Sequence, residues 1–212
     1  SLDITVQSAV EEVLGAGITM MNAKGGAAIL MDVKTGEIVS LAALPSFDPN
    51  DRPNNPTSGE PSDSPLFNRA VQGIYELGST FKIFAASQAI DLGIVNPETL
   101  VDANAPMRYG KFTIKEFENH NYGPMLSVAD IIAKSSNVGT AHIAMMIGGE
   151  RQQAFLKSLG LFDASPVELV EAKGAKPLRP ARWPEIVTIT AAYGHGTSGS
   201  PRNLATAYAT IA

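Results

Sequence analysis

The chain has 212 residues, a formal net charge of -5, and the hydrophobic (44%) and charged (17%) fractions of an ordinary globular protein. These values exclude a disordered chain and a coiled coil. Because no run of Lys and Arg alternates with aromatic residues, we expect no nucleic-acid partner. The absence of cysteine excludes disulfides, thiolate zinc sites and cysteine nucleophiles.

The N-terminal part of the chain predicts a helix, a hairpin and a long loop. Apolar residues at helical spacing over 2–14 favour an amphipathic helix packed on something larger. Two apolar, partly β-branched stretches, 27–33 and 37–44, predict a β-hairpin of largely buried strands, with 34–36 as the turn. The segment 45–65 is rich in Pro, Asn, Asp and Ser, which is typical of a surface loop.

The rest of the chain is predicted to be mainly helical. A buried helix is expected from about Ser79 to Leu92, ended by Gly93. Ser127 can cap a further helix that contains Ile131. The other expected elements are a short hairpin at 107–114, helices at 138–146 and 151–159, a proline-rich linker at 177–184 and a last helix opened by Ser200-Pro201.

The histidines do not predict a metal site. His120, His142 and His195 lie far apart and lack ligand spacing, so we expect neither a metal nor a diffusible cofactor.

No segment approaches the roughly 20 apolar residues of a membrane span. Because the chain begins directly with a helical pattern at Leu2, we interpret it as an excised domain, with any membrane anchor upstream.

Ser79 and Lys82 are the most informative pair in the sequence. A spacing of three residues puts both side chains on one helical face, where the lysine amine can reach the serine hydroxyl. A serine needs such a neighbouring base to become a nucleophile, and burial against apolar groups can lower the pKa of the lysine enough for that role. The same residues also fit a helix-capping serine followed by a solvated lysine.

With its flanking sequence, this pair resembles a known family. The run 67–82 is similar to the nucleophile region of class B penicillin-binding proteins, the peptidoglycan transpeptidases. The run 133–139 is similar to their second signature, Ser-x-Asn. The resemblance extends along nearly the whole chain, through 193–196 and 205–209, and points to the septal, cell-division branch of the family.

The chemistry of this family assigns a role to each polar residue. Ser79 is the acylated nucleophile and Lys82 its base, while the helix N-terminus supplies a backbone N–H and a positive dipole for the oxyanion. The Ser135 hydroxyl can relay a proton between Lys82 and the departing amine. Asn137 offers a donor and an acceptor that suit a substrate amide. An ordinary polar turn is the alternative interpretation of 135–137.

The resemblance also implies the fold. It is an α+β fold of the penicillin-binding-protein/β-lactamase-like transpeptidase type, incomplete at the C-terminus, with the N-terminal hairpin of the antiparallel sheet and the helical subdomain. All of residues 1–212 are then the N-terminal and central part of one transpeptidase domain. The C-terminal remainder of the same domain is an expected partner.

The implied reaction is the cross-linking of peptidoglycan stem peptides. Ser79 attacks the penultimate D-alanine carbonyl of a stem ending in D-Ala-D-Ala, and the amine of a neighbouring stem resolves the acyl-enzyme. β-Lactams are expected to acylate the same serine, and no cofactor or metal is implied. The resemblance places the enzyme on the periplasmic, extracytoplasmic face of the inner membrane, anchored by an N-terminal helix outside this chain, with cell-division membrane proteins as partners.

The third signature of the family, Lys-Thr-Gly, is the main departure. Lys34-Thr35-Gly36 has the right letters, but it precedes the nucleophile and fits a hairpin turn. His195-Gly196-Thr197 matches a glycine-rich segment that comes before the third motif. We therefore expect the true third motif in the missing remainder, and we expect this fragment alone to be inactive.

Three other functions remain open at this point. A serine β-lactamase or a D,D-carboxypeptidase would use similar residues but let water reach the acyl-enzyme. A catalytically inactive sensor or structural module would keep the fold without turnover. Two roles are open to Glu76, Lys134 and the loop 49–65: they shape the cleft, or they are solvated surface groups, which is the role we predict for each.

Overall fold

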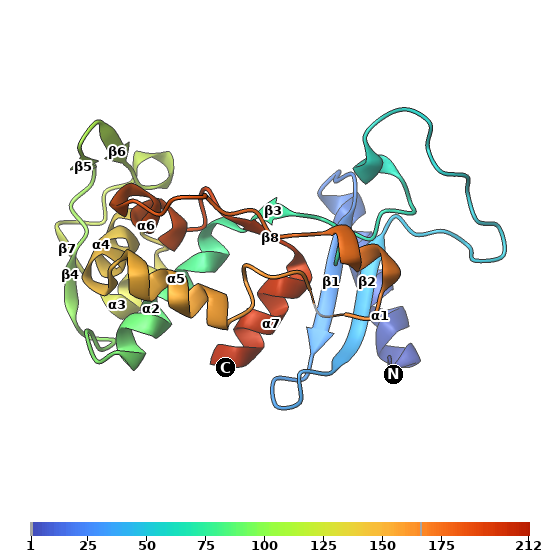
Figure 1. The fold of residues 1–212 in the computed structure, drawn as a ribbon, viewed down its shortest axis with the longest axis horizontal. Coiled ribbons are helices and arrows are strands. Elements are labelled where there is room, and N and C mark those ends of the chain that lie inside the picture. The colour runs from blue at the N-terminus through green and yellow to red at the C-terminus, as the bar shows by residue number, and fades with distance from the viewer. Residues whose placement is uncertain (1, 166) are drawn as a thin grey trace. The chain divides into compact units, whose positions relative to one another are not determined.

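The computed structural model describes residues 2–165 and 167–212 (Figure 1). The chain divides into two compact units, which we describe separately. Unit 1 comprises residues up to 75 together with 159–177 and 199–212, and unit 2 comprises 76–158 and 178–198. Both helices and antiparallel strands are present, which confirms the predicted α+β class.

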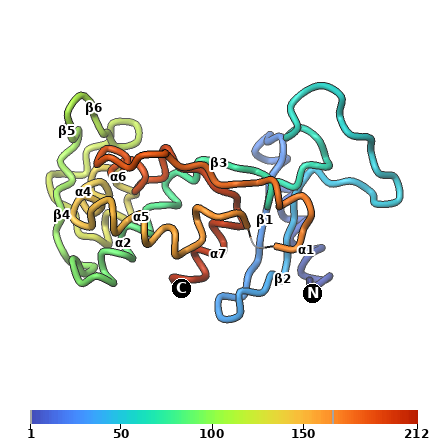
Figure 2. Tube along the Cα trace, viewed as in Figure 1, coloured from blue at the N-terminus to red at the C-terminus, as the bar shows by residue number. Residues whose placement is uncertain are grey.

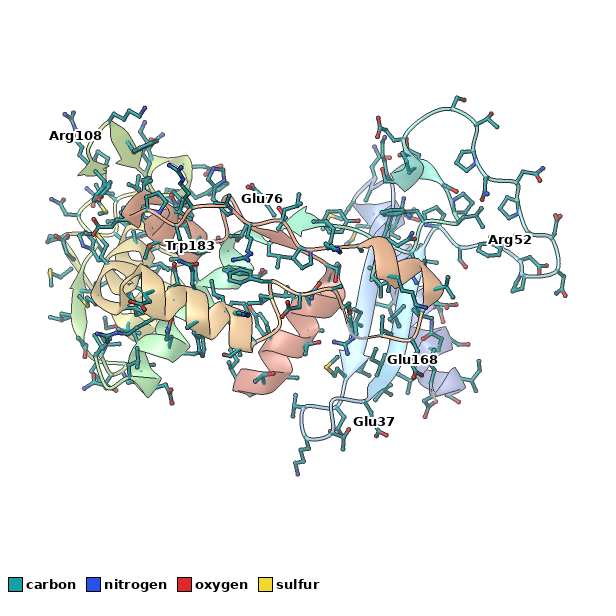
Figure 3. All side chains as sticks on the ribbon, viewed as in Figure 1. Glu37, Arg52, Glu76, Arg108, Glu168 and Trp183 are labelled. Carbon is teal, nitrogen blue, oxygen red and sulfur yellow. The ribbon has the colours of Figure 1, made fainter. Side chains whose placement is uncertain are left out.

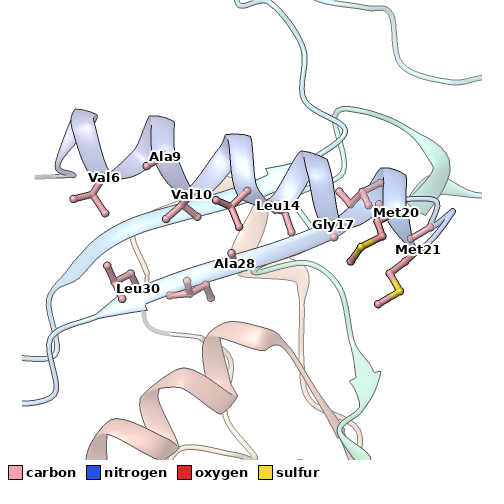
Figure 4. A pocket seen from close by; sticks show the side chains of 15 residues that line it. Val6, Ala9, Val10, Leu14, Gly17, Met20, Met21, Ala28 and Leu30 are labelled. Atoms are coloured by element: carbon pink, nitrogen blue, oxygen red, sulfur yellow. The ribbon is translucent and has the colours of Figure 1, made fainter.

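Unit 1 is built on a helix and a hairpin. Helix α1, Ile4–Met20, begins where the Asp3 carboxylate accepts hydrogen bonds from the backbone N–H groups of Thr5 and Val6, at 2.9 and 3.1 Å. Strand β1, Gly26–Met31, pairs in antiparallel fashion with β2, Ile38–Leu44. The helix lies along the hairpin and contacts both strands (Figure 4).

The turn between β1 and β2 contains the Lys34-Thr35-Gly36 triplet. The Asp32 carboxylate accepts hydrogen bonds from the N–H groups of Lys34 and Thr35, at 2.8 and 2.9 Å. Gly36 has a φ of 74°, a left-handed conformation that favours glycine. Turn formation therefore accounts for the triplet, as predicted.

The prediction of two largely buried strands is wrong. Most residues of β1 and β2 are only half-buried, and just Ser40 and Ala42 of β2 are buried. The reason is that the described sheet has two strands and that α1 covers it loosely, with no buried residue of its own. An open apolar groove of about 800 Å³ remains between the helix and β1 (Figure 4).

The remainder of unit 1 consists of a loop and a C-terminal helix. The predicted surface loop 45–65 is mostly exposed and runs outward as a long excursion from the hairpin, interrupted by the short 3₁₀ helix Pro61–Asp63 (Figure 2). A small buried cluster joins Ala70 and Val71 to Ala172 of a second 3₁₀ helix, Val170–Gly174. Helix α7, Pro201–Ile211, contacts β1 and opens with a capping box between Ser200 and Asn203, as its sequence predicts.

Unit 2 is a cluster of helices around a closed apolar core. Helix α2 packs on α4, and α4 packs on α6. The buried side chains of this core include Ile131, Ile143 and Ile147, each at most 2% exposed. The helices are α2 Lys82–Asp91, α3 Val128–Ala133, α4 Asn137–Ile147, α5 Gly149–Ser158 and α6 Glu185–Ala192.

Short strands frame these helices. The predicted hairpin is formed by β5, Met107–Tyr109, and β6, Phe112–Ile114. A second pair, β4 Leu100–Asp102 with β7 Met125–Ser127, was not expected from the sequence. Other short elements are the two-residue strands β3, Tyr75–Glu76, and β8, Ser198–Gly199, and the 3₁₀ helix Phe117–Asn119.

Helix α6 was also missing from the sequence-based prediction. Its sequence, EIVTITAA, is rich in β-branched residues, which lower helix propensity. It nevertheless buries Thr188, Ile189 and Ala191 in unit 2 and contacts α4. Packing thus outweighs local propensity here.

Among the helices of the described residues, none is long and apolar enough to cross a membrane.

Candidate active site

Ser79 lies on a tight turn at the start of the helix that bears Lys82. The short 3₁₀ helix Gly78–Phe81 precedes α2, and Gly78 opens it with a φ of 54°. Ser79 is exposed, and its hydroxyl makes no hydrogen bond to any residue that the structure describes. The caps of the two helical segments are Leu77 and Phe81, so the alternative interpretation of Ser79 as a capping serine is wrong.

Lys82 is the buried cation of this site. Only 3% of the residue is exposed, because α2 buries it together with Phe84 and Ala85. Its Nζ donates hydrogen bonds to the Ser135 hydroxyl oxygen, at 2.8 Å, and to the Ser135 carbonyl oxygen. Burial lowers the pKa of Lys82 to about 8, while the Glu116 carboxylate acts in the opposite direction. The alternative of a solvated lysine is therefore wrong.

The second motif forms the junction between α3 and α4. Ser135 has a φ of 56°, which is unusual for a residue other than glycine. Ser136 caps α4, and its hydroxyl accepts a hydrogen bond from the Gly139 N–H at 2.9 Å. The Asn137 side-chain amide donates to the Lys115 carbonyl oxygen at 2.9 Å, which fixes its orientation.

The structure thus brings Lys82 and Ser135 into direct contact. Ser79 lies one helical turn from Lys82, and the backbone N–H of Lys82 donates to the Ser79 carbonyl oxygen. The expected hydrogen bond between the Lys82 amine and the Ser79 hydroxyl is not among those of the described residues, since the amine is directed to Ser135. Asn137 follows Ser135 by two positions at the start of α4.

A carboxylate that the sequence did not point to lies behind this motif. Glu116 is 4% exposed, and its oxygens accept hydrogen bonds from the Ser136 hydroxyl at 2.6 Å, the Asn137 N–H at 2.6 Å and the Val138 N–H at 3.2 Å. It stands in the loop after β6, between two exposed residues, Lys115 and Phe117. No local pattern marks this acid as buried, because its partners lie about twenty residues further along the chain.

Glu76, labelled in Figure 3, is exposed, as expected of a solvated surface group, and it also makes specific contacts. Its carboxylate accepts a hydrogen bond from the Gly196 N–H at 2.8 Å and lies 3.3 Å from His195 Nδ1. The same loop touches the turn that bears Ser79, because a Cβ built on Gly194 would lie 2.2 Å from the Gly78 carbonyl oxygen. The loop 194–196 therefore packs directly on the backbone that precedes Ser79.

Lys134 and the histidines complete the residues singled out in the sequence. Lys134 lies 3.5 Å from Asp130 on the surface of α3, as expected of a solvated residue. Among the described residues, no group of three His, Cys, Asp or Glu side chains could hold a metal ion.

This arrangement can perform acid–base chemistry. A lysine with a lowered pKa is a neutral base in a useful fraction of molecules near neutral pH. Its donation to Ser135 Oγ leaves the Ser135 O–H group available to donate a proton elsewhere. Ser79 is exposed and lies one helical turn before the buried Lys82.

The chain is similar to known proteins over its full length. It is 34% identical over 207 residues to the probable peptidoglycan D,D-transpeptidase FtsI of Caulobacter vibrioides, covering 98% of this chain and 33% of that protein. It is 29% identical over 211 residues to the peptidoglycan D,D-transpeptidase FtsI of Escherichia coli, covering 100% of this chain and 34% of that protein. The chain therefore spans about a third of the length of the curated relatives it matches.

A solved structure and a family description agree with these relatives. The apo structure of the TP domain from Burkholderia pseudomallei penicillin-binding protein 3 matches with a TM-score of 0.83 and 32% identity, covering 100% of this chain and 57% of that one. These matches confirm the predicted fold and the predicted resemblance to septal class B penicillin-binding proteins. Residues 26–212 match the family described as the penicillin binding protein transpeptidase domain, and the chain belongs to that family.

Proposed function

We propose that this chain forms part of a serine transpeptidase that cross-links peptidoglycan through an acyl-enzyme on Ser79. In this reaction the Ser79 oxygen bonds to the carbonyl carbon of the penultimate D-alanine, and the bond from that carbon to the terminal D-alanine nitrogen breaks. Lys82 accepts the proton of the serine, and Ser135 passes a proton to the departing amine. The amine of a second stem peptide then displaces Ser79 and completes the cross-link.

The observation that carries this proposal is the contact between Lys82 and Ser135. Lys82 is 3% exposed, has its pKa lowered to about 8 and donates a hydrogen bond to the Ser135 hydroxyl. It lies one helical turn after the exposed Ser79. A stable fold gains little from a desolvated lysine. A base for Ser79, in contrast, needs the lowered pKa that desolvation gives the lysine. The names of the relatives, which are peptidoglycan D,D-transpeptidases, support the same chemistry.

Asn137 is assigned to substrate binding in this proposal. Its side-chain nitrogen is held by the Lys115 carbonyl oxygen, which leaves its oxygen atom to accept a hydrogen bond from an amide of the substrate. Backbone N–H groups at the Ser79 turn are assigned to the developing oxyanion.

We further propose that residues 1–212 are the N-terminal and central part of one transpeptidase domain. Three features support this. The chain covers 57% of the solved TP domain, no further strand among the described residues pairs with β1, and the groove beside β1 is apolar. The C-terminal remainder of the domain, with its Lys-Thr-Gly motif, is the occupant that we assign to this groove and strand edge. The fragment alone is then expected to be inactive.

The biological setting follows from the same family. The assigned substrates are peptidoglycan stem peptides, and β-lactams are the assigned inhibitors, which makes the protein an antibiotic target. We assign the protein to cell division at the periplasmic face of the inner membrane, held by an upstream membrane helix and working with cell-division membrane proteins. The FtsI names of the relatives support this branch.

The test is covalent labelling of the complete protein with a penicillin, read by intact-mass spectrometry and peptide mapping. We expect one adduct, located on Ser79, and none in Ser79→Ala. Ser87→Ala, which removes a second serine hydroxyl from the same helical region, is the matched control and should label like the wild type. An adduct on another residue would contradict the assignment of the nucleophile.

Turnover of nitrocefin separates the alternatives. A transpeptidase is expected to be labelled stoichiometrically and to release product slowly, because its acyl-enzyme is protected from water. Fast hydrolysis would instead identify a β-lactamase. Failure of any β-lactam to label a folded, complete protein would favour the inactive sensor or structural module.

A further inference from the structure

Glu116 is a buried acid that the proposed reaction does not use directly. Its carboxylate binds three groups of one short segment: the Ser136 hydroxyl, the Asn137 N–H and the Val138 N–H. These groups include the first N–H groups of α4, where a negative charge is stabilised by the helix dipole. The acid therefore clamps the N-terminus of α4.

The clamp acts on a turn that needs support. Ser135 has a φ of 56°, a conformation that costs about 1–3 kcal/mol for residues other than glycine and that persists only when its surroundings hold it. Lys82 binds the Ser135 carbonyl and hydroxyl oxygens on one side. Glu116 binds the next three residues on the other. The turn that presents Ser135 and Asn137 is thus held between a cation and an anion.

We propose that Glu116 is a positioning residue of this site, whose carboxylate holds the 135–137 turn in place and presents its negative charge to Lys82. The inference rests on the proposed function, because it concerns the base and the relay of that reaction. Glu116 lies outside the motifs of the family. Its charge acts on Lys82, and its hydrogen bonds hold the turn that bears Ser135.

The charge of Glu116 and its hydrogen bonds have separable effects. The carboxylate raises the pKa of Lys82 against the larger lowering effect of burial. A neutral amide of the same shape removes that charge, so the pKa of Lys82 then falls further and the free amine is present at lower pH. A group that merely braces the turn would change the rate without moving the pH at which the base becomes active.

Other ionisable groups around Lys82 do not compete for this role. Among the described residues, Glu116 is the one charged group that affects the pKa of Lys82. The charged or titratable side chains on the elements packed against α2 have other partners or face solvent: Asp130 with Lys134 on α3, His142 of α4 with Asp102, Glu185 of α6 with Tyr109, and the exposed Glu150, Arg151 and Lys157 of α5.

The experiment measures the second-order rate constant of acylation by a fluorescent penicillin as a function of pH in the complete protein. For Glu116→Gln we expect a rate up to about 100-fold lower on the high-pH plateau, as for a small misplacement of catalytic groups, and a rising limb displaced to lower pH. Glu118→Gln is the matched control. It removes an exposed carboxylate two positions away and should reproduce the wild-type profile.

Glu116→Asp keeps the charge on a shorter side chain and serves if Glu116→Gln does not fold. It should lower the plateau while leaving the rising limb at the wild-type pH. An undisplaced limb in Glu116→Gln, or wild-type rates in Glu116→Asp, would overturn the inference. Absence of acylation in the wild type and in Glu118→Gln alike would instead contradict the proposed function, so the two failures are distinguishable.

Discussion

The hairpin of unit 1 and the helices of unit 2 differ in how well this chain buries them. Helix α1 has no buried residue, and β1 and β2 are mostly half-buried. In contrast, α4 buries residues on several sides, among them Val138, Ile143 and Ile147. One region has a closed core, whereas the other leaves an apolar face open.

The difference shows where the site obtains its rigidity. Ser79, Lys82, Ser135, Asn137 and Glu116 all belong to unit 2, and its closed core orients them. Groups that must act together are best placed on elements whose own side chains are locked by packing. Unit 1 contributes none of these side chains. Its open apolar groove between α1 and β1 is instead a surface on which further polypeptide can pack.

The largest effect, on the rate of acylation, is expected for Lys82, a buried lysine that does not stabilise the fold. Lys82→Met should lower acylation about 10²–10⁴-fold, because the base for Ser79 is lost. At pH 7 its melting temperature should stay close to that of the wild type, since a desolvated cation is replaced by an apolar chain of similar length. Lys134→Met, which removes an exposed lysine, is the control for both measurements. A large loss of stability in Lys82→Met would indicate a structural role.

The same variant tests the pH dependence of stability. The pKa of Lys82 in the folded protein is about 8, whereas the value for a free lysine is 10.5. Between these pH values the unfolded chain binds more protons than the folded one, so the wild type gains stability from this group as the pH rises through that window. Thermal melts from pH 7 to 10 should therefore favour the wild type over Lys82→Met increasingly. A constant difference would contradict the depressed pKa.

A cavity in the closed core should be costly. Ile143 is fully buried, and Ile143→Ala should lower the free energy of unfolding by about 2–5 kcal/mol. The matched truncation in the open unit is Ile4→Ala, at a residue that is 78% exposed and does not line the groove. Chemical denaturation of the two variants measures the contrast, and similar losses for both would contradict it.

The open groove provides a smaller and sharper test. Leu30 is 47% exposed on β1 and lines the groove. If the remainder of the domain covers it, Leu30→Ser should destabilise the complete domain by about 1–2 kcal/mol. Val33→Ser, at a residue that is 54% exposed beyond the end of β1, is the control. Equal, negligible effects in both variants would mean that the groove stays open to solvent.

The smallest predicted effect concerns the start of α7. Ser200→Ala removes the capping hydroxyl that accepts from the Asn203 N–H, at a cost of about 1 kcal/mol. Ser8→Ala on the exposed side of α1 is a suitable control. A loss no larger than that of the control would argue against the capping box.

Local signals predicted most of the elements and the central pair of the site. Periodicity located α1, α2 and α4, and the caps at Ser127 and Ser200 marked helix starts correctly. The spacing of Ser79 and Lys82 holds in the structure because it lies within one helical turn. Such features depend only on residues that are close in the sequence.

The features that escaped prediction depend on contacts between distant segments. Glu116 and Glu76 look like ordinary surface acids until the fold brings Ser136 and Gly196 to them. The β-branched sequence of α6 disfavours a helix until α4 packs on it. The burial of the hairpin was overestimated because apolar residues in a strand do not reveal what covers them.

The close approach of Gly194 to Gly78 limits which residues this protein can carry beside the turn of Ser79. Gly194 has a φ of 77°, and any side chain there would collide with the Gly78 backbone. A larger residue at position 194 would displace the Gly78 backbone and with it Ser79, the next residue. Variation has to enter through the neighbouring His195, whose side chain is 67% exposed and can be exchanged while the glycine contact stays intact.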